Sequence, residues 1–251
     1  MGLRELFRRR RQHEPVPGAS ANPPGGNVTP GGSRIYRHTE TQARSLFGFS
    51  EEDTLPHIEQ REAVYAELFG EDFNVNHELI PMVPHLDVYI FEPTEQRPFY
   101  TLITGGMSDV PMTIPDELDE PGELRRSELL LYANENKPEY AQLLRFLARM
   151  PHEFQTWLGP GHTVPNGDPP KPFFEKSKLT TALLLPPIVE EDQGLRERLT
   201  IKGDPVNPYW VTFLTDRETN LKLRRGTEAI LNLFERRRHP FVLKEQRRSY
   251  V

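Results

Sequence analysis

Ionisable side chains that could support acid–base or metal chemistry gather between Met150 and Pro170. His152, Glu153, His162 and Asp168 all lie in this stretch. The two histidines are ten residues apart, which is not the spacing of a helical ligand pair, and the HExxH pattern is absent. A hydrolase or metal enzyme that uses His152, His162 and Asp168 remains an alternative. It requires these three side chains to converge in an open pocket.

Other common catalytic patterns are missing from the chain. There is no GxSxG, no P-loop and no GxGxxG, and cysteine is absent. The lack of cysteine excludes disulfides, thiolate nucleophiles and cysteine metal sites, and it fits a reducing compartment. We therefore expect no catalytic residue, no metal site and no cofactor.

The same stretch, MPHEFQTWLGPGHTVPNGDPP, follows neither a helical nor a strand period. Its glycines, prolines and asparagine are typical of a rigid loop, for which Trp157 would be the anchor. A structural role is the simpler interpretation, and a partner-binding surface is the functional one. The residues predicted to contact a partner here are Trp157, His162, Asn166 and Asp168.

A second candidate binding segment is Gly105–Asp109, with the sequence GGMSD, which follows a predicted strand. Its two glycines permit positive φ or close approach of another backbone. Ser108 and Asp109 could accept hydrogen bonds from exposed amides of a partner that adds beside the sheet. The alternative is a self-capped turn. The residues predicted for this binding rim are Tyr100, Gly105, Gly106, Met107, Ser108 and Asp109.

The elements that must position these residues follow from hydrophobic periodicity. Helices are predicted at 55–69, from Pro138 to a limit at Pro151, at 216–225 and at 227–238. Asn136 and Thr227 are the expected caps of two of these helices. Strands are predicted at 75–81, 86–91, 98–104, 124–132, 181–185, 199–201 and 209–214. This order predicts an α+β fold with a mixed, largely antiparallel sheet packed by helices.

The charge is distributed unevenly along the chain. The whole chain has a net charge of −6, whereas residues 1–40 contain seven Arg and three Glu. We predict that residues 1–45 are a basic tail, helical at Met1–Gln12, followed by a flexible Pro/Gly-rich linker at Gln12–Ser33. Residues 46–251 would form one folded domain. Its acidic character argues against nucleic-acid binding through its general field.

Two further features bear on partners and location. The acidic run Asp116–Glu123 is expected to be a solvated loop, with complementation of a basic partner as the alternative. No apolar run reaches the length of a transmembrane helix, and no signal-peptide core or myristoylation pattern is present. We therefore predict no transmembrane segment and a cytoplasmic location.

Several of these segments resemble the suppressor of fused family and occur in the family's order. The resemblance begins at HLDVYIFEPTEQRPFYTLITGGMSD and RRSELLLY, and continues through LLRFLARMPHEFQTWLGPGHTVPNGDPP, LLLPP and DRETNLKLRRGTEAIL. The segment PHEFQTWLGPGHTVPNGDPP is specific to the bacterial branch.

The resemblance implies a non-enzymatic protein-binding domain with an α/β sandwich fold. Animal relatives hold an extended peptide of a transcription factor in the Hedgehog pathway, partly at a region similar to Tyr100–Asp109. Bacterial relatives occur among immunity proteins of polymorphic toxin systems. This chain is too short for the second lobe of the animal proteins. The resemblance favours a domain that sequesters a toxin or regulatory protein, with an adaptor for a transcription-factor peptide as the alternative.

Overall fold

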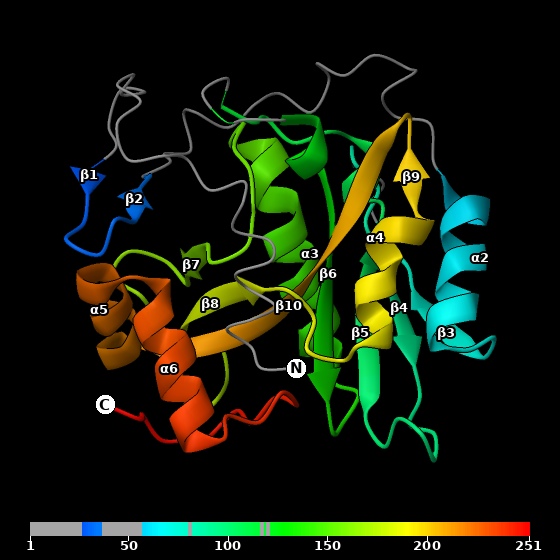
Figure 1. Ribbon diagram of the computed structural model, residues 1–251. Helices are drawn as coiled ribbons and strands as arrows, with labels where there is room; N and C mark the ends of the chain where they lie inside the picture. The colour runs from blue at the N-terminus through cyan, green and yellow to red at the C-terminus, as the bar shows by residue number, and fades with distance from the viewer. Residues whose placement is uncertain (1–26, 37–56, 80–81, 116–117, 119–120) are drawn as a thin grey trace.

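A mixed β-sheet lies between two layers of helices in the computed structural model (Figure 1). The structure describes residues 27–36, 57–79, 82–115, 118 and 121–251. The strands of the main sheet are β3 (Phe73–Asn76), β4 (Asp87–Phe91), β5 (Tyr100–Gly105), β6 (Arg126–Ala133), β7 (Thr163–Pro165), β8 (Leu179–Leu185), β9 (Thr200–Ile201) and β10 (Asp204–Thr215). The helices are α2 (Ile58–Phe69), α3 (Pro138–Glu153), α4 (Leu195–Arg198), α5 (Asp216–Arg225) and α6 (Thr227–Arg237).

The strand order of the main sheet is β3-β4-β5-β6-β10-β8-β7, and β9 pairs with β10 outside this path. Strands β6 and β10 are parallel, whereas the other neighbours in this sheet are antiparallel. The predicted α+β fold with a mixed, largely antiparallel sheet is therefore confirmed. Strand β7 lies inside the stretch Met150–Pro170, which was predicted to have no strand period.

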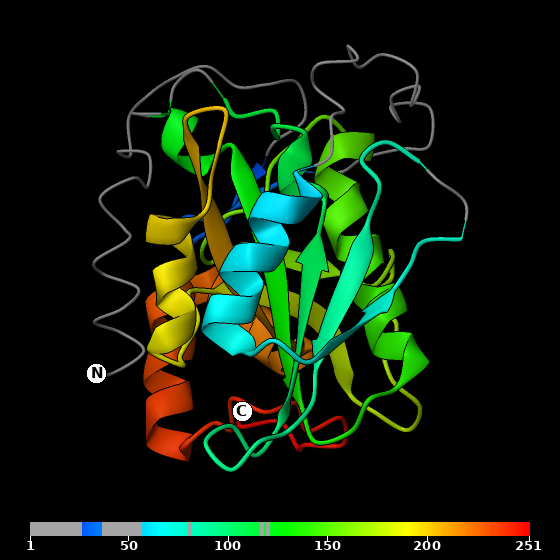
Figure 2. The same ribbon diagram turned by 90° about the vertical axis from the view of Figure 1, so that its right-hand side faces the viewer.

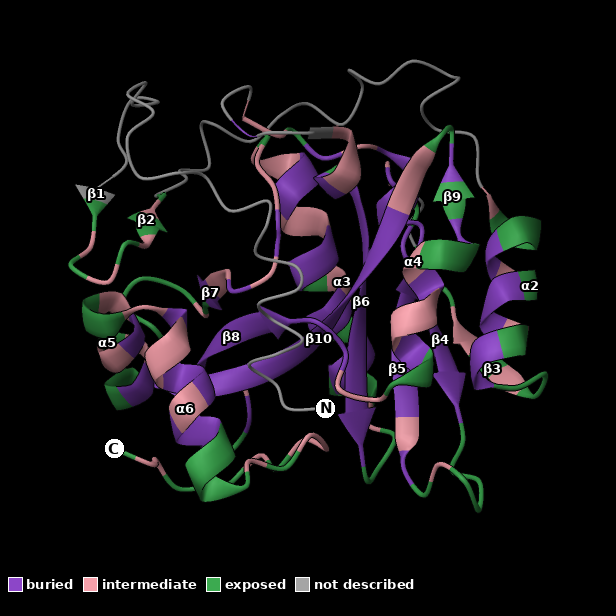
Figure 3. Cartoon of the chain, in the orientation of Figure 1, coloured by how far each residue is buried: buried purple, intermediate pink, exposed green. Residues whose placement is uncertain are grey.

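Both faces of the sheet are buried, and a separate hydrophobic core lies on each face. Helix α3 covers one face, and α2, α4 and α6 lie on the other (Figure 2). On β4, Val88 and Ile90 pack into the α3 core, while Tyr89 and Phe91 pack into the opposite core. This alternation follows from the two-residue period of a strand, and the strands are buried along most of their length (Figure 3).

Three predicted helix signals were wrong in detail. Helix α3 continues through Pro151 and ends at Glu153, where the N–H of Phe154 donates to the carbonyl of Met150 at 3.0 Å. Lys137, not Asn136, occupies its N-cap position. Gly226 is the N-cap of α6, so Thr227 lies inside the helix. A proline near a helix end disturbs only the last turn, which tertiary packing can hold.

A short hairpin precedes the main domain and contradicts part of the linker prediction. Strands β1 (Asn27–Val28) and β2 (Arg34–Ile35) pair antiparallel. The N–H of Gly31 donates to the carbonyl of Leu223 at 2.8 Å, and Lys222 Nζ donates to Ser33 Oγ at 3.2 Å. The flexible-linker prediction is therefore wrong for residues 27–33. The predicted helix at 1–12, the rest of the linker and the predicted domain start near 46 lie outside the described residues.

Replacing Gly31 by Ala is expected to release this hairpin without unfolding the domain. A Cβ at Gly31 would lie 2.3 Å from the N of Gly226, which is backbone and cannot move aside easily. We expect faster amide exchange and proteolysis at residues 27–36, with a change of less than about 0.5 kcal/mol in the free energy of unfolding. Gly32→Ala is the control for strain within the hairpin itself, because Gly32 has a φ of 78° and no atom lies within 4 Å of its Cβ position, whereas Gly31 does not have positive φ. If residues 27–36 are equally protected from amide exchange and proteolysis in Gly31→Ala and Gly32→Ala, the docking of Gly31 against Gly226 is contradicted.

The C-terminal segment packs back across the end of the sheet. The N–H of Leu243 donates to the carbonyl of Tyr132 at 2.7 Å. Arg247 forms a two-pronged ion pair with Glu218 of α5, with both N–O distances at 2.7 Å. No helix in the part of the chain described is long and apolar enough to cross a membrane.

Candidate functional site

The GGMSD loop, Gly105–Asp109, turns sharply at the end of β5. Residues Met107–Asp109 form a short 3₁₀ turn, and Gly106 precedes it with a φ of 107°. A Cβ at Gly106 would lie 1.9 Å from the carbonyl oxygen of His85. The position therefore requires glycine, both for its backbone angle and for the close approach of another chain segment.

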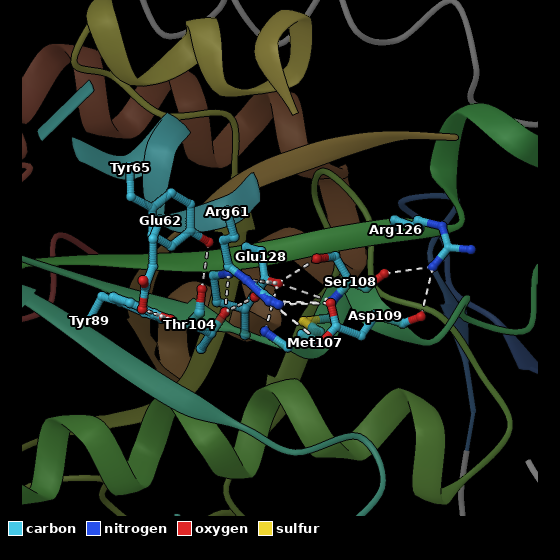
Figure 4. A network of polar contacts seen from close by, with 12 residues as sticks. Arg61, Glu62, Tyr65, Tyr89, Thr104, Met107, Ser108, Asp109, Arg126 and Glu128 are labelled. Atoms are coloured by element: carbon cyan, nitrogen blue, oxygen red, sulfur yellow. Dashed lines mark hydrogen bonds and ion pairs between the residues drawn. The ribbon is translucent and has the colours of Figure 1, made fainter. Parts of the chain in front are cut away.

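Glu128 of β6 holds this loop from inside the protein (Figure 4). Its side chain is fully buried. Its carboxylate accepts hydrogen bonds from Thr104 Oγ1 at 2.6 Å and from the N–H of Gly106 at 3.1 Å. Ser108 donates to it twice, from N–H at 3.0 Å and from Oγ at 2.6 Å. A single carboxylate thus satisfies the inward-facing donors of the turn, as buried polar groups require.

Arg61 of α2 supplies the positive charge of this network. Its guanidinium donates to Asp109 Oδ1 at 2.7 and 3.2 Å, and its Nε lies 3.9 Å from Glu128 Oε1. Burial alone would lower the pKa of Arg61, but Glu128 and Asp109 outweigh burial and raise it. Burial raises the pKa of Glu128, against the opposing effects of Arg61 and of the hydrogen bonds from Ser108 and Thr104. We call Arg61, Asp109 and Glu128 the Arg61 cluster.

Arg126 satisfies the acceptors of the same loop. Its Nη1 donates to the carbonyl of Ser108 at 2.7 Å and to that of Asp109 at 3.0 Å. Its Nε donates to Asp204 Oδ2 at 3.2 Å. Strands β6 and β10 and helix α2 therefore fix the loop together, which makes it a rigid part of the fold.

The predicted exposed acceptors are inside the protein. All five residues of the GGMSD loop are buried, and Ser108 and Asp109 bond to Glu128 and Arg61. The prediction that Ser108 and Asp109 face partner amides is therefore wrong, and a structural turn is what the structure shows. The roles of Arg61, Glu128 and Arg126 were not predicted from the sequence. A usable signal was present, because Glu128 directly precedes the apolar run Leu129–Leu131 in a predicted strand, and a buried charge needs a partner.

Tyr100 lies at the other end of β5 from the GGMSD loop. In the sheet register, Tyr100 is opposite Ala133 and Gly105 is opposite Asp87. Five residue steps along a strand span about 17 Å. Tyr100 and the loop therefore do not form one continuous rim.

The end of α3 joins the second predicted segment to the GGMSD loop. Nε2 of His152, buried, lies 3.1 Å from the carbonyl oxygen of Met107. The N–H of Leu158 donates to Sδ of Met112 at 3.4 Å. The start of the Trp157 region thus shares one end of the sheet with the GGMSD loop.

Trp157 anchors its loop, as predicted from the sequence. Its ring packs against the α3 core and meets the ring of His162 edge-on, with centroids 4.3 Å apart. A Cβ at Gly159 would lie 2.4 Å from this ring, so the loop can close only over glycine. Burial and the charge of Lys222 lower the pKa of His162 to about 4, so the ring is neutral near pH 7.

Asn166 and Asp168 lie beyond β7, away from the GGMSD loop. The N–H of Asn166 donates to the carbonyl of Thr180 at 2.9 Å, and its Nδ2 donates to the carbonyl of Pro172 at 3.1 Å. Asp168 is exposed and precedes a cis peptide bond to Pro169.

The three side chains of the enzymatic alternative have separate surroundings. His152 contacts Met107, His162 contacts Trp157, and Asp168 is exposed. Burial lowers the pKa of His152 to about 4, despite its hydrogen bond with Met107. Among the residues that the structure describes, no group of three or more His, Asp or Glu could hold a metal ion.

Gly106→Ala is expected to lower the free energy of unfolding by about 2–3 kcal/mol. Positive φ costs an alanine about 1–2 kcal/mol, and displacement of the His85 carbonyl adds to that cost. Urea unfolding measures the change. Gly70→Ala is the matched control, because Gly70 has a φ of 117° and nothing within 4 Å of its Cβ position. Equal losses in the two variants would show that the contact with His85 contributes nothing.

Comparison with known proteins gives a family and several similar folds. Residues 83–248 match the family model described as suppressor of fused protein, SUFU. No curated protein matches the sequence. A putative SUFU homologue from Neisseria gonorrhoeae FA 1090 has a TM-score of 0.59 at 15% identity, over 77% of this chain and 96% of that chain.

Two further structures have the same fold. One is a Sufu–Fu complex, with a TM-score of 0.53 at 16% identity, over 78% of this chain and 92% of the matched chain. The other is Drosophila Suppressor of Fused, with a TM-score of 0.50 at 15% identity, over 79% of this chain and 52% of that protein. This chain therefore spans about half of the Drosophila protein. Because the family model matches more than half of the chain, the chain belongs to the suppressor of fused family.

Proposed function

We propose that this chain is a non-enzymatic domain that binds and sequesters a protein partner in the cytoplasm, as the immunity protein of a bacterial toxin system. One observation carries the proposal. The three candidates for catalysis, His152, His162 and Asp168, have separate surroundings, and Ser108, Asp109 and His152 all bond within the fold. They fix the shape of one end of the sheet and leave no reactive group directed outward from the GGMSD loop. A rigid surface suits recognition, because little ordering is needed on binding.

The partner surface that we propose centres on Trp157, with His162, Asn166 and Asp168 beside it. Trp157 and His162 are partly exposed, and Asp168 is exposed. An aromatic ring held by its neighbours is a typical interface anchor. The GGMSD loop and the following Met112 support this surface through the contacts of Met107 with His152 and of Met112 with Leu158.

Co-purification of the full chain with the products of neighbouring genes tests this function. We expect one complex that survives gel filtration and, when the partner is a toxin, protection of cells that express it. Asp168→Arg should weaken the complex by about tenfold or more, which corresponds to about 1.4 kcal/mol. Glu67→Ala on α2 is the control, because Glu67 is exposed and lies on another face.

Three outcomes would count against the proposal. Failure to form a complex with any neighbouring gene product would remove its main support. Capture of a DNA-binding regulator would favour the adaptor alternative. Substrate turnover that disappears in a His152→Gln or His162→Gln variant with an unchanged fold would favour an enzyme.

A further inference from the structure

The last two helices and the C-terminal segment differ in charge from the rest of the domain. Residues 216–251 contain ten Arg and Lys against five Asp and Glu, a net charge of +5. Residues 41–215 have a net charge of −15. The fold therefore places a basic end on an otherwise acidic domain.

An open hollow of about 390 Å³ lies within this basic end. We call it the arginine hollow, and it is lined by Leu221, Leu233, Arg236, Arg237, Tyr250 and Val251. Leu233 is buried, whereas Arg236 and Arg237 are exposed. Arg236 and Arg237 follow Leu233 by three and four residues on α6, so they share its side of the helix. The hollow thus combines aliphatic and aromatic surface with two guanidinium groups.

Glu218 and Glu235 leave these arginines available, and the terminal oxygen of Val251, which lines the hollow, accepts a hydrogen bond from Arg217 Nη1 at 3.4 Å. Glu218 is buried and bonds to Arg247 and to the N–H groups of Thr215 and Tyr250. Glu235 precedes Arg236 by one residue, and a single step turns the side chain by about 100° around the helix. The bond that Arg237 makes to the carbonyl of Tyr250 is 3.4 Å long, at the weak limit of hydrogen bonding.

We propose that the arginine hollow binds an acidic peptide segment of a protein partner. An aliphatic or aromatic side chain of this segment would rest on Leu221, Leu233 and Tyr250, while flanking carboxylates pair with Arg236 and Arg237. Guanidinium and carboxylate groups match in two-pronged geometry. The inference rests on the proposed protein-binding function and adds a second contact surface, distinct from the Trp157 surface.

A peptide fits this site better than a nucleic acid does. A duplex extends far beyond the hollow and would meet the field of the acidic residues in the rest of the domain. A short peptide stays within about one Debye length, roughly 8 Å, of the arginines. The leucines also offer apolar contact, which a phosphate backbone cannot use.

Peptide display on the full chain tests the proposal directly. Random peptides are selected on the wild-type chain, and binders to an Arg236→Glu/Arg237→Glu variant are removed. Labelled copies of the surviving peptides are then titrated by fluorescence anisotropy. Arg224→Glu/Arg225→Glu is the matched control, since both pairs occupy the last turn of a helix and only Arg236 and Arg237 line the hollow.

We expect the surviving peptides to combine Asp or Glu with one large apolar residue. Their affinity should fall by about tenfold or more in Arg236→Glu/Arg237→Glu and by less than about twofold in the control. Replacing the apolar residue of the peptide by Ala should also weaken binding by about tenfold. If peptide affinity falls equally in Arg236→Glu/Arg237→Glu and in the control, the binding depends on the general charge of this end and the proposal is overturned.

Two other results would also overturn it. One is the absence of peptides that distinguish the wild-type chain from Arg236→Glu/Arg237→Glu. The other is tighter binding of a short DNA duplex with the same dependence on Arg236 and Arg237.

The two proposals can fail separately. If a neighbouring gene product binds equally well to Arg236→Glu/Arg237→Glu and peptides do not bind, only this inference fails. If peptides bind the hollow and no protein complex forms, the proposed function fails.

Discussion

Arg61→Ala is expected to lower the free energy of unfolding by about 3–5 kcal/mol. The substitution leaves Glu128 and Asp109 buried without their cationic partner, and loss of one partner from a buried ion pair has about this cost. The four hydrogen bonds that Glu128 accepts remain, so the effect comes from the uncompensated charge. Urea unfolding followed by circular dichroism measures the change.

The pH dependence of this effect identifies its cause. Burial raises the pKa of Glu128 in the folded state, so its ionisation costs stability as the pH rises. Without Arg61 this pKa rises further, so the deficit of Arg61→Ala should be larger at pH 7 than at pH 4. Glu67→Ala, on an exposed part of the same helix, should change stability by less than about 0.5 kcal/mol. If Arg61→Ala lowers the free energy of unfolding by the same amount at both pH values, the destabilisation comes from lost packing rather than from the uncompensated charge.

Arg247→Ala should destabilise the protein by a similar amount, about 3–5 kcal/mol, and free the C-terminal segment. Arg247 contacts Glu218 through two bonds of 2.7 Å and donates to the carbonyl of Phe213 at 2.6 Å. Its removal leaves the buried carboxylate of Glu218 with only backbone donors. Urea unfolding gives the energy, and limited proteolysis should show earlier cleavage after residue 240.

The folded-state pKa of Glu218 is shifted in the opposite direction to that of Glu128, and this shift sets the pH dependence of the Arg247→Ala effect. Burial alone would raise the pKa of Glu218, but Arg247 and the N–H groups of Thr215 and Tyr250 outweigh it and lower this pKa below 4.5. The stabilisation is therefore present above the unfolded pKa and is lost as the pH falls through the folded pKa. The difference between wild type and Arg247→Ala should shrink below about pH 4. Arg248→Ala, an exposed neighbour, should match the wild type at each pH.

Periodicity predicted most of the fold correctly, because each element carries its own pattern. Strand β4 alternates between the two cores, and Asp216–Arg225 matches the predicted helix. Gly31 marks the limit of this reasoning. Its surroundings are rich in Pro and Gly and read as a linker, yet its backbone lies against Gly226, far away in the chain. A pattern within one segment cannot reveal such a contact.

The candidate site was predicted in part. Trp157 and the glycines around it were recognised as a rigid loop, because those residue types restrict the backbone by themselves. Ser108 and Asp109 were predicted either to accept hydrogen bonds at a partner-binding rim or to belong to a self-capped turn. Their burial depends on Glu128 and Arg61, which lie on other elements.

By itself, the sequence determined the residue types, the order of helices and strands and the resemblance to a family. These properties are local, and they follow from backbone preferences and from hydrophobic period. Only the tertiary structure decided which charges are paired. It buried Asp109 against Arg61 and left Arg236 and Arg237 exposed around a hollow. Whether a charged side chain stabilises the fold or remains available to a partner depends on its distance to groups far along the chain, because the Coulomb energy follows spatial separation and burial rather than sequence position.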